Sequence, residues 1–276
     1  MPDWNPAEMI GNAPRRLAYS LYRHLITDAV WADARARMGY KRVDRPLMTS
    51  FGGRPYIDVR ASLNSFLPAD LEPGIADRLI DHQIRVLADN VDLHDKIEFA
   101  VAITCRDLGF AVRKWELTAA GLAEADIDAF GVALHGLTAR ALAEGRGGLG
   151  ALVRITDGVL NHGLAEACHD PLERTQRLLE AVIKSGTLPF SILARHAFIG
   201  VSFLHSLVDR GILSPTAVDE FMRSIHTVAA DVVLDMAAVS EGTLAREMFL
   251  DRHGHLRPGT YDIQAQRYDQ APDLYL

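Results

Sequence analysis

The stretch Pro189-Phe-Ser-Ile-Leu-Ala-Arg-His-Ala-Phe-Ile-Gly-Val-Ser-Phe-Leu-His-Ser-Leu-Val-Asp-Arg210 decides the fold. Its apolar residues fall on most sides of a helix, a pattern typical of a helix buried at the centre of a protein. Gly211 follows directly and supplies a helix end. The sequence therefore predicts a central helix over 189–210, with other helices packed around it.

Apolar residues at helical spacing indicate those other helices. Between Pro14 and Met38 they recur every four residues, and Gly39 ends the stripe. A second stripe runs from Ile75 to about Asn90. Two further helices are expected over 94–108 and around 127–137, the latter breaking in the glycine-rich connector 145–150.

Capping residues predict the boundaries of the later helices. Asp170-Pro-Leu-Glu173 places a cap, an N1 proline and an N3 glutamate in the order of a capping box. Gly186 is the expected end of that helix. Ser214-Pro215 begins the last long helix, which is expected to reach Ser240 or beyond.

One segment reads as β-structure. Between Leu47 and Arg60, two short runs of apolar or β-branched residues flank Gly52-Gly53, a hairpin signal. The fold class is thus mainly α. We expect a single compact helical domain over 1–276, with one small β-hairpin near residues 47–60 and an irregular C-terminal tail from residue 251.

Composition excludes several classes of protein. A net charge of −7 argues against a nucleic-acid surface. No signal peptide is visible and no apolar run suits a membrane span, so we expect a cytoplasmic protein with no membrane partner. Cys105 and Cys168 form no metal or disulfide pattern, and the histidine spacings match no zinc motif. No metal site is expected.

Three segments carry candidate functional residues. Strand alternation points Tyr56, Asp58 and Arg60 to one side of the hairpin, with Asn64 just beyond; a solvated polar face is the alternative. In the tail, glycines and proline fix an irregular backbone around four polar side chains, and such segments often carry sites. These are His255, Arg257, Tyr261 and Asp262.

The third segment, His94-Asp-Lys-Ile-Glu98, packs four ionisable groups into one turn. It reads either as a capped, solvated helix start with a His94–Glu98 pair or as a segment that turns the Glu98 carboxylate into a pocket.

Several short segments, in order along nearly the whole chain, resemble the middle region of phosphoenolpyruvate-synthase-like phosphotransferases, a family that includes rifampicin phosphotransferase and an L-glutamine kinase of capsule biosynthesis. They are Asp3-Trp-Asn-Pro-Ala-Glu-Met-Ile-Gly11, Gly52-Gly-Arg-Pro-Tyr-Ile-Asp-Val-Arg60, Asn64-Ser-Phe66, His94-Asp-Lys96, Gly186-Thr-Leu-Pro-Phe190, Leu193-Ala-Arg195 and Gly254-His-Leu-Arg-Pro-Gly-Thr-Tyr-Asp262.

The resemblance implies an incomplete enzyme. In the family an ATP-grasp region binds ATP, a swivelling domain carries a phosphorylated histidine, and the helical middle region binds the acceptor. No ATP-grasp length precedes Trp4 and no carrier motif follows Leu276, so the chain is expected to be an excised or stand-alone middle domain. It should bind no cofactor itself, with ATP and Mg on partner domains acting in cis or in trans. His196 lies within the apolar helix without a glycine-rich lead-in, so it is not taken as the carrier histidine.

The resemblance also suggests roles for the candidate residues in transferring a phosphoryl group to a small polar acceptor. Arg54, Arg60 and Arg257 would bind an acceptor carboxylate or phosphoryl oxygens, since guanidinium groups make bidentate contacts. Asp58, His255 or Asp262 would accept the acceptor's proton. The residues that would orient the acceptor are Tyr56, Asn64 and Tyr261.

The tail favours the surface-polysaccharide branch of the family over the antibiotic-inactivating branch. Leu256-Arg257 and Asp262 replace parts of the Gly-His-Arg-Gly-Pro-Gly-Glu run usual in the latter. Glutamine is the acceptor that this branch suggests. Two other readings stay open: a non-catalytic docking or scaffold domain derived from the family, and a free-standing enzyme of unrelated chemistry.

Overall fold

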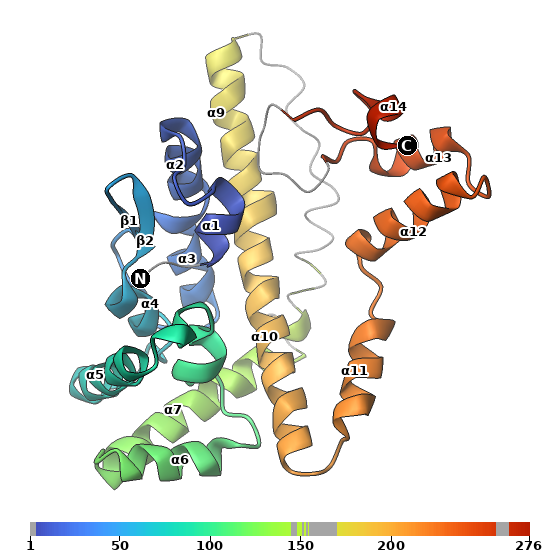
Figure 1. The fold of residues 1–276 in the computed structure, drawn as a ribbon. Coiled ribbons are helices and arrows are strands. Elements are labelled where there is room, and N and C mark those ends of the chain that lie inside the picture. The colour runs from blue at the N-terminus through green and yellow to red at the C-terminus, as the bar shows by residue number, and fades with distance from the viewer. Residues whose placement is uncertain (1–3, 145–147, 151, 153, 155–169, 258–264) are drawn as a thin grey trace. The chain divides into compact units, whose positions relative to one another are not determined.

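The computed structural model describes residues 4–144, 148–150, 152, 154, 170–257 and 265–276. The chain is 68% helical and its sheet is a two-stranded antiparallel hairpin, which confirms the mainly α class (Figure 1). Contacts group it into two compact units, Met1–Ile212 and Leu213–Leu276. No shift in composition marks this boundary in the sequence.

The first unit begins with α1 (Trp4–Ile10), α2 (Arg16–Tyr22), the π-turn η1 (Arg23–Thr27), α3 (Val30–Arg37), β1 (Met48–Phe51), β2 (Arg54–Ile57), α4 (Val59–Asn64) and α5 (Pro73–Asp89). It continues with the 3-10 turn η2 (Val91–Asp95), the π-turn η3 (Ile97–Val101), α6 (Phe110–Ala119), α7 (Glu124–Leu142), α9 (Pro171–Val182), the π-turn η4 (Ile183–Thr187) and α10 (Leu188–Asp209).

Three apolar clusters hold this unit together; a small one joins α3 to the hairpin, and the other two are larger. The largest one joins α4, α5, α6 and α7, and its fully buried members include Leu79, Ile80 and Phe130. The second lies where α3, α7 and α10 meet, with Leu137 and Ile199 at zero exposure. Burying side chains of this size contributes about 1.5–3 kcal/mol each. The second cluster fixes α10 against α3.

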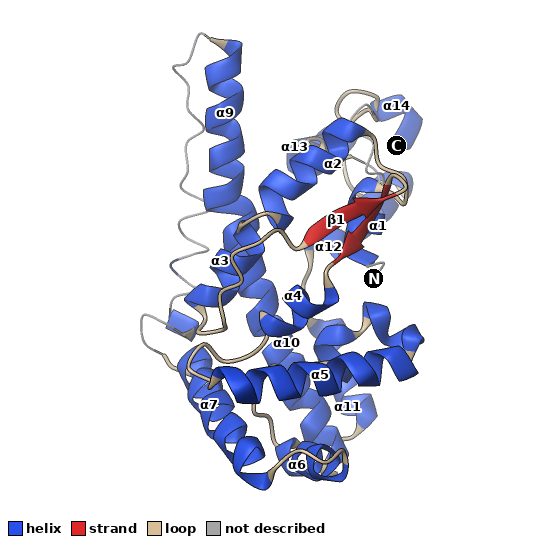
Figure 2. Ribbon diagram, turned by 90° about the vertical axis from the view of Figure 1, so that its left-hand side faces the viewer, coloured by secondary structure: helices blue, strands red, loops and turns tan. Residues whose placement is uncertain are grey.

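The glycine-bracketed hairpin forms as predicted. Met48 pairs with Ile57 and Phe51 pairs with Arg54, leaving Gly52-Gly53 as a two-residue turn. Both glycines have positive φ, 56° and 77°, the combination that a type I′ turn requires. The second strand ends at Ile57 and leads into α4 (Figure 2).

The helix that begins at Pro171 does not end at Gly186. Asp170 caps it as predicted by accepting from the amide of Leu172. Gly186 instead lies within η4, and the helix continues from Pro171 to Asp209. A π-turn adds one residue to a turn of helix. Pro189, the second residue of α10, therefore follows η4 without breaking the helix.

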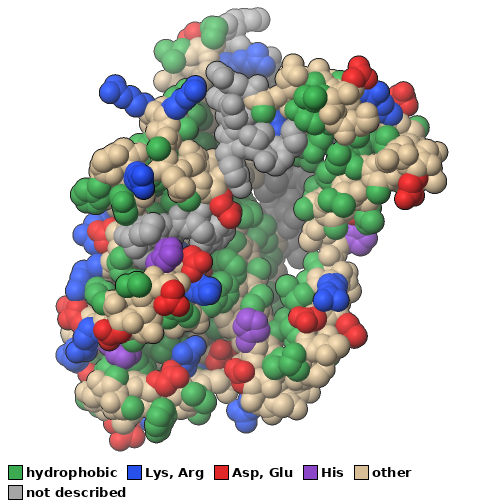
Figure 3. Space-filling model, viewed as in Figure 1, with side chains coloured by type: hydrophobic (Ala, Val, Ile, Leu, Met, Phe, Trp, Pro, Cys, Tyr) green, Lys and Arg blue, Asp and Glu red, His purple; other side chains and the backbone are tan. Residues whose placement is uncertain are grey.

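The central helix is only partly buried. Leu188, Ile192, Arg195 and Ile199 face the core, whereas Phe190 is 69% exposed. Hydrophobic side chains are visible on the surface over α10 (Figure 3). The prediction of a helix buried on most sides was therefore wrong. Gly211, with a φ of 67°, ends the helix as expected.

Three other helix predictions need correction. The 14–38 helix is interrupted at Asp28-Ala29, between η1 and α3. The stretch 94–108 is a 3-10 turn, a π-turn and extended chain rather than a helix, and α6 follows where none was expected. The last long helix is two helices, because Thr227 caps a new one.

The second unit contains α11 (Pro215–Ser224), α12 (Val228–Ser240), α13 (Arg246–His253) and α14 (Pro272–Tyr275). Its buried centre is small. The Phe249 ring lies against both His253 and Tyr268, and Asp235 of α12 bonds the His253 ring at 2.9 Å. The tail is thus partly helical rather than wholly irregular.

One helix, Pro171–Asp209, is long and apolar enough by length and composition to cross a membrane, which is weak evidence by itself. Arg195 in this helix is buried and ion-paired within the unit.

Candidate functional site

The most buried group of charges among the described residues of the first unit lies between α3, η3 and α10. Arg35 projects from the last turn of α3 and Arg195 from the core-facing side of α10. Glu98 reaches them from the π-turn η3. Three segments distant in sequence thereby meet, because the second apolar cluster brings α3 and α10 together.

Glu98 is shared between the two arginines. Its Oε1 lies 3.2 Å from Nη2 of Arg35, and its Oε2 lies 2.7 Å from Nη1 of Arg195. The Arg195 side chain is 4% exposed, that of Arg35 15% and that of Glu98 27%. The cluster is thus deepest at Arg195 and reaches solvent at Glu98.

Neutral groups complete the contacts of the arginines. Arg35 donates to the buried hydroxyl of Ser65, and Nη2 of Arg195 donates to Oγ1 of Thr104 at 3.1 Å. The Phe66 ring lies 3.9 Å from the Arg35 guanidinium carbon and 5.5 Å from that of Arg195. Such cation–π contacts offset part of the cost of removing a guanidinium from water.

Two weak acids beside the arginines stay protonated near neutral pH. Burial raises the pKa of the Tyr40 hydroxyl to about 12, although Arg195 lowers it. Burial, together with Asp107, raises the pKa of the Cys105 thiol to about 11. Neither group therefore supplies negative charge to the cluster, and Tyr40 donates to the carbonyl of Thr104 instead.

Two buried nitrogens at the cluster lack a hydrogen-bond partner among the described residues. They are the Nε of Arg195 and the indole nitrogen of Trp31, which lies one turn before Arg35. A buried donor without a partner costs about 1–3 kcal/mol. The interface of α3 with α10 thus has hydrogen-bonding capacity that its own side chains do not use.

The predicted hairpin residues do not share one strand face. Asp58 is the N-cap of α4: its Oδ1 accepts from the amide of Ala61 at 2.9 Å, and its Oδ2 lies 3.1 Å from Arg45. Arg60 is on the helix and pairs with Asp81 of α5 at 2.6 Å. The expected alternation was wrong because β2 ends before Asp58.

The remaining hairpin candidates are peripheral. Arg54 is exposed at the turn, and the half-buried Tyr56 ring packs edge-on against Phe51 at 5.6 Å. Asn64 donates to the carbonyl of Arg60 at 3.0 Å. Its neighbour Ser65, however, contacts Arg35, so this segment borders the arginine cluster.

The tail candidates belong to the second unit. His255 is exposed, and Arg257 donates from Nε to the carbonyl of Ala265 at 2.9 Å. Tyr261 and Asp262 lie outside the described residues. Among those that are described, no group of three potential metal ligands occurs.

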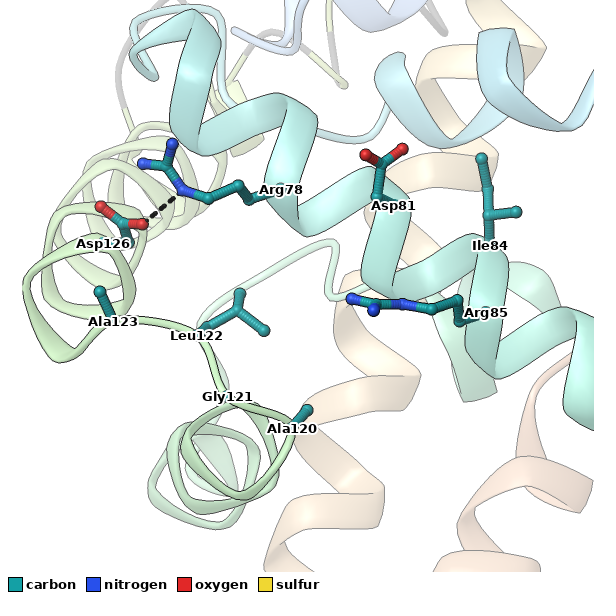
Figure 4. A pocket seen from close by; sticks show the side chains of 9 residues that line it. All are labelled: Arg78, Asp81, Ile84, Arg85, Ala120, Gly121, Leu122, Ala123 and Asp126. Carbon is teal, nitrogen blue, oxygen red and sulfur yellow. Dashed lines mark hydrogen bonds and ion pairs between the residues drawn. The ribbon is translucent and has the colours of Figure 1, made fainter.

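A surface cleft of about 850 Å³ lies between α5 and the turn from α6 to α7. Figure 4 shows Arg78 directed at Asp126, with which it pairs at 2.7 Å, and Arg85 on the same wall of α5. Asp81 also lines the cleft, but its carboxylate is already paired with Arg60. Most charges of this cleft are therefore neutralised locally.

Sequence reasoning singled out Glu98 as a candidate and named Ser65, Phe66 and Arg195 only within segments that resemble the family. Neither reading of the His94–Glu98 segment is met in full. His94 bonds the carbonyl of Val91 rather than Glu98, and Glu98 pairs with the two arginines without lining the described cleft. No short-range sequence pattern marked Arg35 or Thr104 as a functional residue. No family model, curated protein or solved structure matches the chain.

Proposed function

We propose that this chain is the acceptor-binding domain of a phosphoenolpyruvate-synthase-like, ATP-dependent phosphotransferase of the cytoplasm. In this proposal it holds a small polar acceptor, the glutamine amide being the first candidate, for surface-polysaccharide modification. ATP and Mg would be bound by an ATP-grasp domain, and a phosphohistidine domain would carry the phosphoryl group between the sites.

One observation carries the proposal. Two of the segments that resemble the family reach the arginine cluster: Asn64-Ser-Phe66 through Ser65 and Phe66, and Leu193-Ala-Arg195 through Arg195. Glu98 lies two residues beyond a third, His94-Asp-Lys96. If these separate segments build one site, that shared site is the physical reason for the resemblance in each of them. Positive charge held in a fixed geometry is what acceptor and phosphoryl oxygens need for in-line transfer.

The test is a phosphotransfer assay with the full set of partner domains. ATP, Mg and L-glutamine are incubated with the ATP-grasp and phosphohistidine domains, with and without this chain, and phosphorylated product is followed by mass spectrometry. Product that depends on the chain supports the proposal. ATP turnover and product formation that are the same without the chain would contradict it.

A non-catalytic docking domain is a second candidate, favoured by a specific observation. In the described second unit, α11 and α12 bury none of their residues, and α12 exposes Val228, Val233 and Leu234. A docking role predicts that Val233→Asp abolishes association with the partner domains. The acceptor-binding role predicts that Arg195→Lys reduces product while association persists.

A further inference from the structure

We infer that Arg35 and Arg195 form a site for a small oxyanion, and that Glu98 occupies it until a ligand carboxylate or phosphoryl group takes its place. The site is argued from geometry and charge. Only the identification of its ligand with the phosphotransfer acceptor rests on the proposed function.

Charge is the first argument. Arg195 is 3% exposed, and its only ionic partner among the described residues is a carboxylate that it shares with Arg35. Its second hydrogen bond goes to a neutral hydroxyl, Thr104. Tyr40 and Cys105 stay protonated. A buried guanidinium that receives part of one negative charge is under-compensated, because removing an ion from water costs several kcal/mol.

Unused donors are the second argument. The Nε–H of Arg195 is buried without a partner, so the guanidinium has an edge that Glu98 does not fill. The indole N–H of Trp31 is also unpaired, and the Trp31 ring lies 5.2 Å from the Arg35 guanidinium carbon. Donors without acceptors fit an oxygen-rich ligand, and planar guanidinium forks favour carboxylate and phosphoryl groups.

Glu98 is the member of the cluster best able to leave. It is the most exposed of the three charges and lies on a five-residue π-turn between a 3-10 turn and extended chain. Arg35 and Arg195, by contrast, are on helices anchored in the second apolar cluster. Ile97 and Val101 of the same turn are buried in the largest apolar cluster, so the displacement requires a new rotamer of the Glu98 side chain rather than movement of the turn. The Phe66 ring centroid lies within 5.5 Å of both guanidinium carbons, so a ligand would have to fit beside this ring.

The test uses Trp31 as its reporter. The chain has three tryptophans, so Trp4→Phe with Trp115→Phe leaves Trp31 as the sole indole. Inorganic phosphate, L-glutamine and L-glutaminamide, which lacks the carboxylate, are titrated at constant ionic strength. Fluorescence and calorimetry give the affinities, and circular dichroism checks the fold of every variant.

Glu98→Gln should bind phosphate about tenfold more tightly than the parent, since a neutral amide does not compete as a carboxylate does. The matched control Glu173→Gln, an exposed glutamate of α9, should leave the affinity unchanged. Arg35→Lys keeps the charge but loses the fork and should weaken binding about fivefold; it serves as the second measurement if Glu98→Gln does not fold. Binding of L-glutamine but not L-glutaminamide would identify the carboxylate as the ligand group.

Absence of any phosphate or carboxylate effect on Trp31, in the parent and in Glu98→Gln alike, would overturn the inference. Glu98 would then be a permanent structural partner. The proposed function is tested separately by product formation. Anion binding without phosphotransfer would remove only the acceptor role. Phosphotransfer that is insensitive to Glu98→Gln and Arg35→Lys would show that the acceptor is held elsewhere, and the anion site would still be decided by the binding titrations.

Discussion

Arg35 and Arg195 hold opposite oxygens of one carboxylate, that of Glu98, at 3.2 and 2.7 Å. The three residues come from a helix near the start of the chain, an irregular turn and the longest helix. This shared carboxylate ties the packing of α3 against α10 to the chemistry of the candidate site.

Removing Arg195 should be destabilising. Arg195→Met removes one charged hydrogen bond of Glu98, which keeps Arg35 and reaches solvent, and should lower the free energy of unfolding by about 1.5–3 kcal/mol. Urea denaturation measures it. The exposed i,i+4 pair of Arg177 with Glu173 gives the control: Arg177→Met should cost less than about 1 kcal/mol. Equal losses for both variants would show that Arg195 is not effectively buried.

Stability should fall at alkaline pH because of Tyr40. Its folded pKa of about 12 lies above the ordinary tyrosine value of 10.0, so folding favours the protonated hydroxyl. The unfolded chain loses this proton first. The stabilisation is therefore fully present below pH 10, declines as the pH rises from 10 towards 12, and is lost above that. Denaturant midpoints at pH 9, 10 and 11 test this, and Tyr40→Phe should flatten the profile over that interval.

The two glycine types should respond oppositely to alanine. Gly53 has a φ of 77° in open space, so Gly53→Ala introduces backbone strain alone and should cost about 1 kcal/mol. Gly200 is exposed in the middle of α10, also with nothing near its added Cβ, so Gly200→Ala should stabilise by about 0.4–1 kcal/mol. Thermal unfolding of both variants decides the matter, and a shift of the same sign would contradict it.

The capping and catalytic roles of Asp58 can be separated. Asp58→Ala removes the cap on α4 and should cost about 1 kcal/mol, whereas Asp58→Asn keeps an acceptor for the Ala61 amide and should be nearly neutral. If Asp58 is also the proton acceptor, Asp58→Asn should abolish phosphotransfer at unchanged stability. Full activity of the stable amide variant would leave Asp58 with the cap alone.

Local signals made much of the fold predictable. The helix of the 75–90 stripe, the cap at Asp170 and the glycine-bracketed hairpin depend on residues close in sequence, and all three form. The error at Gly186 has a physical cause, because a π-turn can pass a glycine that would otherwise end a helix. Thr227 begins a new helix where an apolar stripe suggested continuity.

The candidate site was less predictable because it depends on tertiary contacts. The alternation of Tyr56, Asp58 and Arg60 presupposed a strand three residues longer than the real one. Arg35 looked like any arginine of an amphipathic helix. Its role depends on the approach of α10 and η3, which no short-range pattern encodes.

The π-turn η4 also sets the rotational phase of the longest helix. One residue advances an α-helix by about 100°. Deleting a residue between 183 and 187 would therefore turn either α9 or α10 about its axis. Arg195 and Ile199 anchor α10, whereas α9 buries none of its residues, so α9 would rotate and the site would survive. A deletion between 189 and 191 would instead put the buried Leu188 out of phase with Ile192, Arg195 and Ile199, so these residues would no longer face the core together.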